Sequence, residues 1–560
     1  MEIFIKDYIK EDKNCTPAFC AALSALKDGD TLVLDNKKYN FYPEGAFLKE
    51  YHISNNDSGI KPIAIPIINK KNITIDARGA DLIFHGQMMP IVVDNSENIT
   101  LKGFSIDYSV PFFAQATIKD KDESGILIEF DGKEFNAKVK DGKFCFFNNK
   151  QGWEFNPERA LSLEFDENGH PSTYSPTYYA YMGKPKDHGF LSWLFKDATL
   201  EERGDNLIFM KADVAERHKI GNTLVMTYAG RKYPGILITE SKDVTLENIN
   251  LYYTAAMGIV AQTSENISLK RIVAEPRKES GRLISTNADA THFINCRGNI
   301  SLSECKFVQM MDDASNIHGI YNIYKEKIDK TSIKLTFGHP QHKGIRVYRK
   351  GDQIAIIDKD TNETKLIAKV IDVAMISEEE MIVTLDKEAP EQNCNLLTEN
   401  LSSSPNVHFI NCESGYNRPR GFLISTRGKA IVENCKFYNM NSAIQISGEM
   451  HGWYESGGVR DVTIKNCDFN NSAYAGGVAI SSKPSGNYEK YPFNEKLTIE
   501  NNVFTQANKR ICIIESYKEV IFKNNRFRHN KDLSKYAMRG EDGTIFNNCK
   551  KLIKDPVITE

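Results

Sequence analysis

The chain has 560 residues, of which 71 are basic and 74 acidic, so its formal net charge at pH 7 is only −3. Proteins that bind nucleic acid or an anionic membrane surface normally carry a basic excess. The balanced charge of this chain therefore argues against both kinds of partner and favours a partner that is neutral or recognised by a local site. No run of about 18 apolar residues predicts a membrane span, and MEIFIKDYIKEDKN lacks the apolar core of a secretory signal.

The N-terminal segment predicts a helix followed by a strand. Thr16 suits the N-cap, Pro17 suits the first helical position, and AFCAALSALK forms an amphipathic helix that ends at DGD. The first predicted strand is TLVLDNKKYNF. A helix in this place would cover the open end of a stack of strands and protect its unpaired edge.

Short β-rich phrases of one type then recur along most of the chain. They begin at Asn72, Glu97, Lys242, Glu265, Gly298, Asn406, Lys429, Arg460, Glu495 and Lys518. Thr245 to Ser268 and Ser268 to Thr291 are each 23 residues apart, and Thr74 to Thr100 is 26. A period of this size is one coil of a parallel β-helix, in which strands stack about 4.8 Å apart.

Each phrase alternates apolar and polar residues, as a strand with one face inward does, and Asn follows at the bend, where it tolerates left-handed geometry. Eleven cysteines occur without Cys-x-x-Cys pairs or zinc-type spacing. Five of them stand in similar contexts: Cys296, Cys305, Cys412, Cys435 and Cys467. We interpret these as small buried apolar side chains at equivalent repeat positions and not as a disulfide framework.

Two stretches interrupt the coil rhythm with hairpin-like strands, and this divides the chain into five segments. Residues 1–108 are the N-terminal cap and first coils, and residues 109–235 are an inserted β-barrel-like domain. Residues 236–320 are the next coils, residues 321–398 are a second inserted β-barrel-like domain, and residues 399–560 are the C-terminal coils. KIGNTLVMTY and RKGDQIAIID look alike, so the two insertions are predicted to be of related type.

Three aspartates mark a candidate catalytic centre. Asp289 precedes the adjacent pair Asp312 and Asp313 by 23 residues, which equals the coil period. If Asp289 and Asp312 are equivalent on neighbouring coils, their Cα atoms lie about 5 Å apart. Clustered carboxylates repel, so at least one pKa rises, and a neutral acid beside an ionised base is what glycoside hydrolysis needs. The alternative is that all three are solvated turn residues.

Polar side chains near these acids are candidates for binding the substrate. The phrase DDASNIHG contributes Asn316 and His318, which could bind sugar hydroxyls or orient a carboxylate. The following coils contribute Arg418, Arg420, Arg427, Glu449, His451, Trp453 and Glu455. Trp453 is one of three tryptophans, and either a sugar platform or a core-sealing role suits it. No Walker loop, GxGxxG, HExxH or GxSxG motif is present, which argues against nucleotide chemistry, zinc proteolysis and serine hydrolysis.

The phrases NADATHFINCRG, MDDASNIHG, RPRGFLISTRGKAIVENC and GWYESGGVRDVTI together resemble glycoside hydrolase family 110, the exo-acting α-1,3-galactosidases. The resemblance covers nearly the whole chain. It implies an all-β fold, a right-handed parallel β-helix with an N-terminal capping helix and two inserted small antiparallel β-barrel domains. It also implies release of terminal α-1,3-linked galactose, from the blood group B antigen or from linear Gal-α-1,3-Gal, with inversion and without a metal or other cofactor.

By this resemblance Asp312 matches the general acid, and Asp289 and Asp313 match the candidates for the base that activates water. One departure is Asn287, where the family more often carries an acid. The expected partner is a galactose-terminated oligosaccharide or glycoconjugate, and family habit favours a secreted or periplasmic protein. The oligomeric state stays open, with a homodimer one option.

Other readings remain at this point. Polygalacturonases, also inverting β-helix enzymes, carry Asn-x-Asp followed about one coil later by Asp-Asp, and RGK at 427–429 could imitate their Arg-x-Lys motif. Here, however, His318 follows the acidic pair at once, in IHG. A non-catalytic carbohydrate-binding β-helix would have little use for clustered repelling acids. A β-helix lyase would need calcium and a basic residue.

Overall fold

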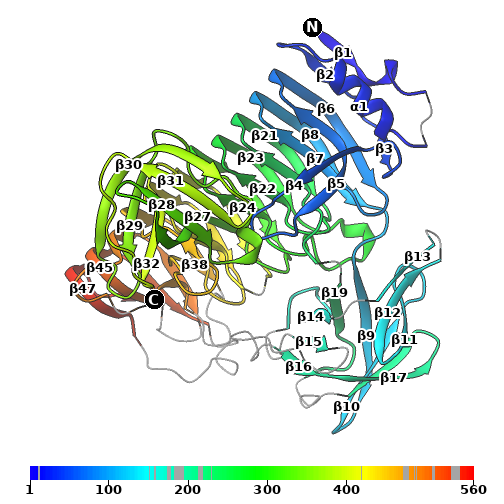
Figure 1. Cartoon of the computed structure of the whole chain (residues 1–560). Helices are drawn as coiled ribbons and strands as arrows, with labels where there is room; N and C mark the ends of the chain where they lie inside the picture. The colour runs from blue at the N-terminus through cyan, green and yellow to red at the C-terminus, as the bar shows by residue number, and fades with distance from the viewer. Residues whose placement is uncertain are drawn as a thin grey trace.

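The computed structural model is a parallel β-helix with two further domains set into it, in agreement with the predicted all-β class (Figure 1). It describes residues 1–10, 13–149, 152–156, 159–172, 178–181, 195–211, 218–228, 230–417, 419–470, 478–484, 486, 488–506, 511–530 and 543–560. The coils run from the blue N-terminal end to the red C-terminal end, and the first insertion projects from the side of the stack. No described helix is long and apolar enough to span a membrane.

Three parallel sheets form the faces of the helix, and we number them by the order in which the chain meets them in one coil. Sheet 1 contains β5 (Gly59–Ile68), β7 (Met89–Asp94), β20 (Ile236–Thr239), β22 (Ile259–Gln262), β24 (Thr291–Ile294), the start of β27 (Ser315–Lys327), β35 (Phe422–Ile424), β38 (Ile444–Gln445), β42 (Ile480–Ser482) and the starts of β45 (Cys512–Lys523) and β47 (Ile545–Lys554).

Sheet 2 begins with β1 (Glu2–Phe4) and β2 (Thr31–Val33) and continues through β6 (Lys71–Phe84), β8 (Glu97–Tyr108), β21 (Lys242–Leu251), β23 (Glu265–Ala274), β25 (Arg297–Ser303), β33 (Asn406–Ile410), β36 (Lys429–Glu433), β40 (Asp461–Lys465) and β43 (Asn494–Glu500). Sheet 3 contains β3 (Lys38–Phe41), β26 (Lys306–Val308), β34 (Glu413–Gly415), β37 (Lys436–Tyr438), β41 (Asp468–Asn470), β44 (Val503–Gln506), β46 (Arg526–His529) and β48 (Ile558–Thr559). The long strands β6, β8, β21 and β23 bend from sheet 2 into sheet 3.

The bends are made by residues that tolerate left-handed backbone, as predicted. Asn72, Asn98 and Asn266 have φ values of 53°, 54° and 56°. Their side chains also bond from coil to coil, because Asn98 Nδ2 donates to Asn72 Oδ1 at 2.7 Å and Asn266 Nδ2 donates to Asp243 Oδ1 at 2.8 Å. The predicted phrases are therefore strands joined by stacked polar bends.

The coil register agrees with part of the predicted spacing. Thr74 pairs with Thr100, and Thr245 pairs with Ser268, as expected. Ser268, however, pairs with Ser301 in sheet 2, and Thr291 pairs with Ile259 in sheet 1. The second interval of 23 residues was thus a wrong equivalence, because the coil after β23 is longer and contains the 3₁₀ helix Lys278–Ser280.

The N-terminal cap differs in detail from the prediction. Helix α1 (Thr16–Ala25) begins with Thr16 as a helical residue, and the N-cap is Cys15. The Thr16 hydroxyl donates to the Tyr42 carbonyl at 2.8 Å, so it is not a capping group. The first strand is β1, which pairs with β2. Phe19 packs edge-on against Tyr39 and Phe41, which joins the helix to the first coil.

All eleven cysteines are free. Cys305, Cys412, Cys435 and Cys467 stand at one bend of successive coils, each one residue before a paired position of sheet 3. All four are buried. They fill the bend as small apolar side chains, as predicted. Cys296 was predicted at an equivalent position, but it lies at a different bend, between β24 of sheet 1 and β25 of sheet 2, where it is also buried.

The first insertion forms an eight-stranded sheet in the order β16-β15-β14-β19-β9-β10-β18-β17 and a three-stranded sheet, β11-β12-β13. The strands are β9 (Phe113–Lys121), β10 (Gly125–Phe130), β11 (Asn136–Lys140), β12 (Lys143–Asn148), β13 (Trp153–Phe155), β14 (Arg159–Phe165), β15 (Tyr178–Tyr181), β16 (Phe195–Asp197), β17 (Thr199–Gly204), β18 (Leu207–Lys211) and β19 (Thr223–Thr227).

The second insertion is a closed barrel that begins inside a strand of the β-helix. β27 leaves sheet 1 and continues as a barrel strand, pairing antiparallel with β28 (Ser332–Phe337) and β32 (Leu396–Asn400). β31 (Glu380–Leu385), β30 (Thr364–Met375) and β29 (Gln353–Asp358) close the ring. The barrel therefore shares the strand β27 with the coil that follows Asp313.

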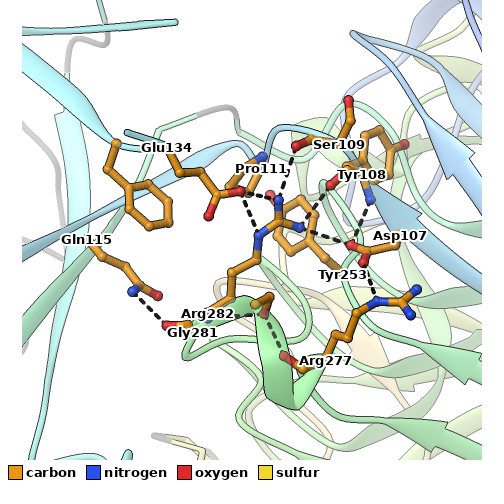
Figure 2. A network of polar contacts seen from close by, with 12 residues as sticks. Asp107, Tyr108, Ser109, Pro111, Gln115, Glu134, Tyr253, Arg277, Gly281 and Arg282 are labelled. Atoms are coloured by element: carbon orange, nitrogen blue, oxygen red, sulfur yellow. Dashed lines mark hydrogen bonds and ion pairs between the residues drawn. The ribbon is translucent and has the colours of Figure 1, made fainter. Parts of the chain in front are cut away.

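A buried arginine joins the first insertion to the coils (Figure 2). Arg282 donates to Asp107 Oδ1 at 3.0 Å and to the Tyr108 carbonyl at 2.8 Å, and it pairs with Glu134 of the insertion. Arg277 binds the second oxygen of Asp107 at 3.2 Å. These bonds fix the loop 275–288 that leads to Asp289, so the insertion and the aspartate loop are held as one unit.

We expect Arg282→Met to lower the midpoint of thermal unfolding clearly, because it leaves Asp107 and Glu134 without their shared cation. Removing one partner of a buried pair costs about 3–5 kcal/mol. The control is Arg203→Met, which removes an exposed pair with Glu201 on the edge strand β17 and should change little. Equal midpoints for the two variants would contradict this role of Arg282.

Candidate active site

The three predicted aspartates lie together at the start of sheet 1. One carboxylate oxygen of each of Asp289, Asp312 and Asp313 lies within 4.8 Å of the other two. The register differs by one residue from the prediction, because Thr286 bridges to Met310 and Thr291 pairs with Ser315, both 24 residues on. Asp289 therefore stacks on Asp313, and Asp312 stands beside this pair on the turn.

Two arginines neutralise part of this charge. Arg420 binds Asp313 with Nε at 2.8 Å and Nη2 at 2.5 Å, and its backbone N–H adds a bond at 3.1 Å. Arg231, at the end of the first insertion, binds Asp312 Oδ2 through Nη2 at 2.5 Å. Three carboxylates beside two guanidiniums leave one negative charge unmatched.

Burial and mutual repulsion both favour a proton in this cluster. The exposed fraction is 3% for Asp289 and 1% for Asp313, whereas the Asp312 side chain is 22% exposed. Burial, reinforced by the charge of Asp312, raises the pKa of Asp289; burial also raises the pKa of Asp313, although Arg420 opposes it. Two carboxylates this close repel by roughly 3–4 kcal/mol at an effective dielectric constant of about 20, so the cluster can keep a proton at neutral pH.

Two histidines back the cluster on the outer face of sheet 1. His292 Nδ1 contacts Asp289 Oδ2 at 2.5 Å, and His292 Nε2 contacts His318 Nε2 at 2.9 Å. His318 Nδ1 contacts the Gly319 carbonyl at 2.7 Å, and its Nε2 lies 3.5 Å from Glu455 Oε1. Both rings are buried. The predicted residue His318 therefore has both ring nitrogens engaged by protein.

Segments distant in the sequence complete the surroundings. Asn55, in the loop between β4 (Phe47–Tyr51) and β5, donates to Glu455 Oε1 at 3.0 Å. His342 of the 3₁₀ helix Pro340–His342 contacts Asn55 Oδ1 at 2.9 Å. Glu455 stands on β39 (Glu455–Ser456), which pairs with β27 beside Gly319. The N-terminal hairpin, the barrel and the C-terminal coils thus meet at the aspartates.

Two buried amides keep an acceptor without a protein partner. Asn316 is the cross-strand neighbour of His292, and its Oδ1 accepts no hydrogen bond from the described residues. Asn287 Oδ1 is likewise unpaired, while its Nδ2 donates to the carbonyls of Phe112 and Ala255. Buried acceptors are normally satisfied, so these atoms are suited to a water or a substrate hydroxyl.

Trp453 lies at the edge of this region and packs on His339 of the barrel, with ring centroids 4.4 Å apart. Its side chain is partly exposed, and it belongs to none of the three core clusters formed by the described residues. This position favours the sugar platform over the core-sealing alternative.

Two predicted substrate-binding residues have other partners. The Glu449 carboxylate accepts the backbone N–H groups of His451, Gly452, Trp453 and Tyr454, so it shapes this loop. Arg427 binds Glu399 of β32 through Nε at 2.9 Å and Nη2 at 2.7 Å. Arg427 thereby ties the barrel to the following coil. Both side chains are thus engaged by protein partners, and their substrate-binding role stays a prediction. Arg418 lies outside the described residues.

The sequence reading missed Arg231, His292 and Asn55. His292 carried a usable signal, since strand alternation in THFI points it outward, three residues after Asp289. Arg231 and Asn55 lie far from the aspartate motifs in sequence, and no spacing rule connects them. Only the docking of the first insertion and of the N-terminal hairpin brings them to the site.

Two groups of side chains bring metal-type ligand atoms close together, the three aspartates and the trio His292, His318 and Glu455. Asp312 and Asp313 are paired with arginine guanidiniums, and His292 and His318 contact each other.

Comparisons with known proteins identify the family. Residues 332–393 match the family model described as GLAA-B beta-barrel domain II. The chain is 30% identical to alpha-1,3-galactosidase B of Bacteroides thetaiotaomicron, over 98% of this chain and 90% of that protein. It is 32% identical to alpha-1,3-galactosidase A of Shewanella woodyi, over 91% of this chain and 82% of that protein.

Among solved structures, the polygalacturonase of Erwinia carotovora ssp. carotovora is similar at 9% identity and a TM-score of 0.38, over 98% of this chain and 94% of that one. The full-length relatives at 30% identity or more confirm the resemblance seen in the sequence. The chain belongs to the α-1,3-galactosidase family, glycoside hydrolase family 110.

Proposed function

We propose that the protein is an exo-acting α-galactosidase that hydrolyses terminal α-1,3-linked galactose from oligosaccharides or glycoconjugates with inversion. The observation that carries this proposal is the cluster of Asp289, Asp312 and Asp313, found in a chain whose relatives are named alpha-1,3-galactosidases. A pair of carboxylic acids, one protonated and one ionised, is the equipment of glycoside hydrolysis.

Asp312 is the general acid in this proposal. It is the most exposed of the three carboxyl groups, so a glycosidic oxygen arriving from solvent meets it first. Arg231 holds one oxygen and leaves Oδ1 without a hydrogen bond from the described residues. In this role Asp312 donates a proton to the leaving oxygen as the bond to the anomeric carbon breaks.

Asp289 and Asp313 hold the attacking water. The nearest carboxylate oxygens lie closer than the roughly 6.5–9.5 Å that commonly separates acid and base in inverting enzymes. Two oxygens up to 4.8 Å apart can nevertheless accept both hydrogens of one water at about 2.8 Å each. Inversion here depends on a water shared by this stacked pair and not on a wide gap.

The remaining polar atoms are suited to galactose hydroxyls. Asn316 Oδ1 is a buried acceptor without a partner, and Glu455 Oε2 accepts no hydrogen bond from the described residues, since Asn55 binds Oε1. Trp453 supplies an apolar ring surface beside them. The alternative of a polygalacturonase-like site is weakened because Arg427, the candidate for binding a uronate, is paired with Glu399.

A hydrolysis panel tests the substrate class directly. It compares the branched blood group B trisaccharide, linear α-1,3-digalactoside, α-1,4- and α-1,6-digalactosides and polygalacturonate. Free galactose from the α-1,3-linked substrates supports the proposal. Cleavage of polygalacturonate alone, or of none, contradicts it.

We expect Asp312→Asn to lower kcat on α-1,3-digalactoside by about 10²–10⁴-fold, because the amide cannot protonate the leaving oxygen. The same variant should keep far more of its activity on α-galactosyl fluoride, since fluoride leaves without a proton. Asp289→Asn should lose activity on both substrates.

The matched control for this comparison is Asp468→Asn, an exposed aspartate of β41, which should behave like the wild type. An Asp312→Asn enzyme that is equally impaired on both substrates would remove Asp312 as the acid.

Proton NMR of the first-formed sugar tests the stereochemistry. We expect β-galactose to appear first from an α-linked substrate, because water attacks from the face opposite the leaving group. Early accumulation of α-galactose would show retention, and one aspartate would then be a nucleophile.

A further inference from the structure

We propose that His292, held in place by His318, is a positioning residue that makes Asp289 the water-activating base and leaves Asp313 as its partner in holding the water. This inference rests on the proposed function and deepens it. It selects one of two candidate bases and gives roles to two buried histidines that the hydrolytic scheme does not otherwise use.

The geometry is a chain of three contacts that starts at the base. Asp289 Oδ2 contacts His292 Nδ1 at 2.5 Å, and His292 Nε2 contacts His318 Nε2 at 2.9 Å. His318 Nδ1 then contacts the Gly319 carbonyl at 2.7 Å. The two rings stand almost perpendicular, with an interplanar angle of 85°. All three side chains are buried, so bulk water does not compete for these bonds.

The protons in this chain can be assigned from its fixed end. A carbonyl only accepts, so His318 Nδ1 carries a proton, and in a neutral ring His318 Nε2 then accepts. His292 Nε2 must therefore donate to it. The remaining contact, between His292 Nδ1 and Asp289 Oδ2, holds one further proton. That proton belongs either to a neutral carboxyl or to an imidazolium paired with a carboxylate.

This shared proton allows Asp289 to ionise and act as a base, although burial opposes its ionisation. Burial raises the pKa of Asp289 and holds the pKa of His292 well below its ordinary value, so at rest the proton favours the carboxyl. When it moves to His292, Asp289 is ionised without any proton leaving the protein. Burial works against ionisation of Glu455, but His318 and His292 lower the pKa of Glu455 overall, so its negative charge faces the histidine pair.

Asp313 is less suited to take the proton from water. Arg420 binds both of its oxygens and approaches Oδ1 twice, through Nε and the backbone N–H. A bidentate guanidinium stabilises the ionised carboxylate and lowers its basicity. Asp289 has no guanidinium bond among the described residues, and its Oδ1 accepts no hydrogen bond there.

Other ionisable groups surround the pair and set its charge. Those nearest Asp289 and His292 are Asp312, Asp313, Arg231, Arg420, His318 and Glu455, with His342 of the barrel facing His318 and His339 packed against His342. With Asp312 protonated and one proton shared by Asp289 and His292, the acids Asp289, Asp313 and Glu455 balance the cations Arg231, Arg420 and His292. The site is then neutral overall.

The chemical step balances with these roles. The water oxygen bonds to the anomeric carbon while one of its hydrogens passes to Asp289 Oδ1, and the bond from that carbon to the glycosidic oxygen breaks. The leaving oxygen takes the proton of Asp312. His292 neither gains nor loses an atom in the net reaction, and solvent later returns the proton from Asp289 to Asp312.

The pH dependence of kcat/KM on α-1,3-digalactoside tests this inference. His292→Asn keeps an amide N–H near Asp289 but cannot take a proton. We expect its acidic limb to move upward by about one pH unit or more and kcat at the optimum to fall by about 10²-fold. His318→Leu, which removes the acceptor for His292 Nε2, should shift the profile in the same direction as His292→Asn.

The matched control is His408→Gln. It removes a histidine that also contacts a carboxylate, Glu433, at 2.7 Å, but that lies on sheet 2 outside the site. Its profile should equal that of the wild type. If His292→Asn leaves the acidic limb in place while Asp313→Asn abolishes activity, Asp313 is the base and the inference fails. If the wild type itself releases no galactose, the proposed function fails instead.

A second measurement needs no variant of the site and so does not depend on how well such variants fold. In ¹⁵N-histidine-labelled wild-type protein, His318 should be the Nδ1–H tautomer, and His292 should carry an exchange-protected ring proton on Nε2. An Nε2–H tautomer of His318, or a His292 ring without a proton on Nε2, would overturn the inference.

Discussion

The pairing of three aspartates with two arginines is the constraint on which the rest of the site depends. Stacked coils bring equivalent residues about 4.8 Å apart, so a β-helix can hold carboxylates closer than most folds permit. Such closeness is costly unless cations or protons relieve it. Arg420 and Arg231 supply the cations, and the charge that stays unmatched explains why a proton remains in the cluster.

These two arginines come from different parts of the fold, so the site depends on how those parts are assembled. Arg420 comes from the coil after the barrel and reaches back across the insertion to Asp313. Arg231 is delivered by the first insertion, which Arg282 locks to the loop that leads to Asp289. Barrel and N-terminal hairpin add His342 and Asn55, which orient Glu455. The insertions therefore supply side chains that surround the aspartates, and the β-helix supplies the aspartates themselves.

Much of the fold could be read from the sequence because the repeated phrases carry their own register. Thr74 with Thr100 and Thr245 with Ser268 are pairs that alternation and spacing alone identify. The same reasoning failed at Ser268 and Thr291, because these residues lie in different sheets. The coil between them contains a longer loop, so the interval of 23 residues matched the coil period by coincidence. The predicted cluster of aspartates is nevertheless present, because the true register is shifted by one residue and Asp289 stacks on Asp313 instead of the adjacent Asp312.

Contacts made across domains could not be predicted in this way. Glu449 and Arg427 stood in suitable motifs, yet one folds its own loop and the other anchors the barrel. His292 was within reach of strand alternation, whereas Arg231 was not, because its position depends on how the first insertion docks. Local patterns thus identified the acids, and long-range packing decided which neighbours control them.

The most direct test of the shared proton is ¹³C NMR titration of the aspartate carboxyl carbons in labelled protein, with Asp289→Asn, Asp312→Asn and Asp313→Asn used for assignment. At pH 7 we expect at least one of the three carboxyls to show the chemical shift of a protonated acid and to titrate well above an ordinary aspartate. Three carboxyls that all titrate near the ordinary value of about 3.9 would contradict it.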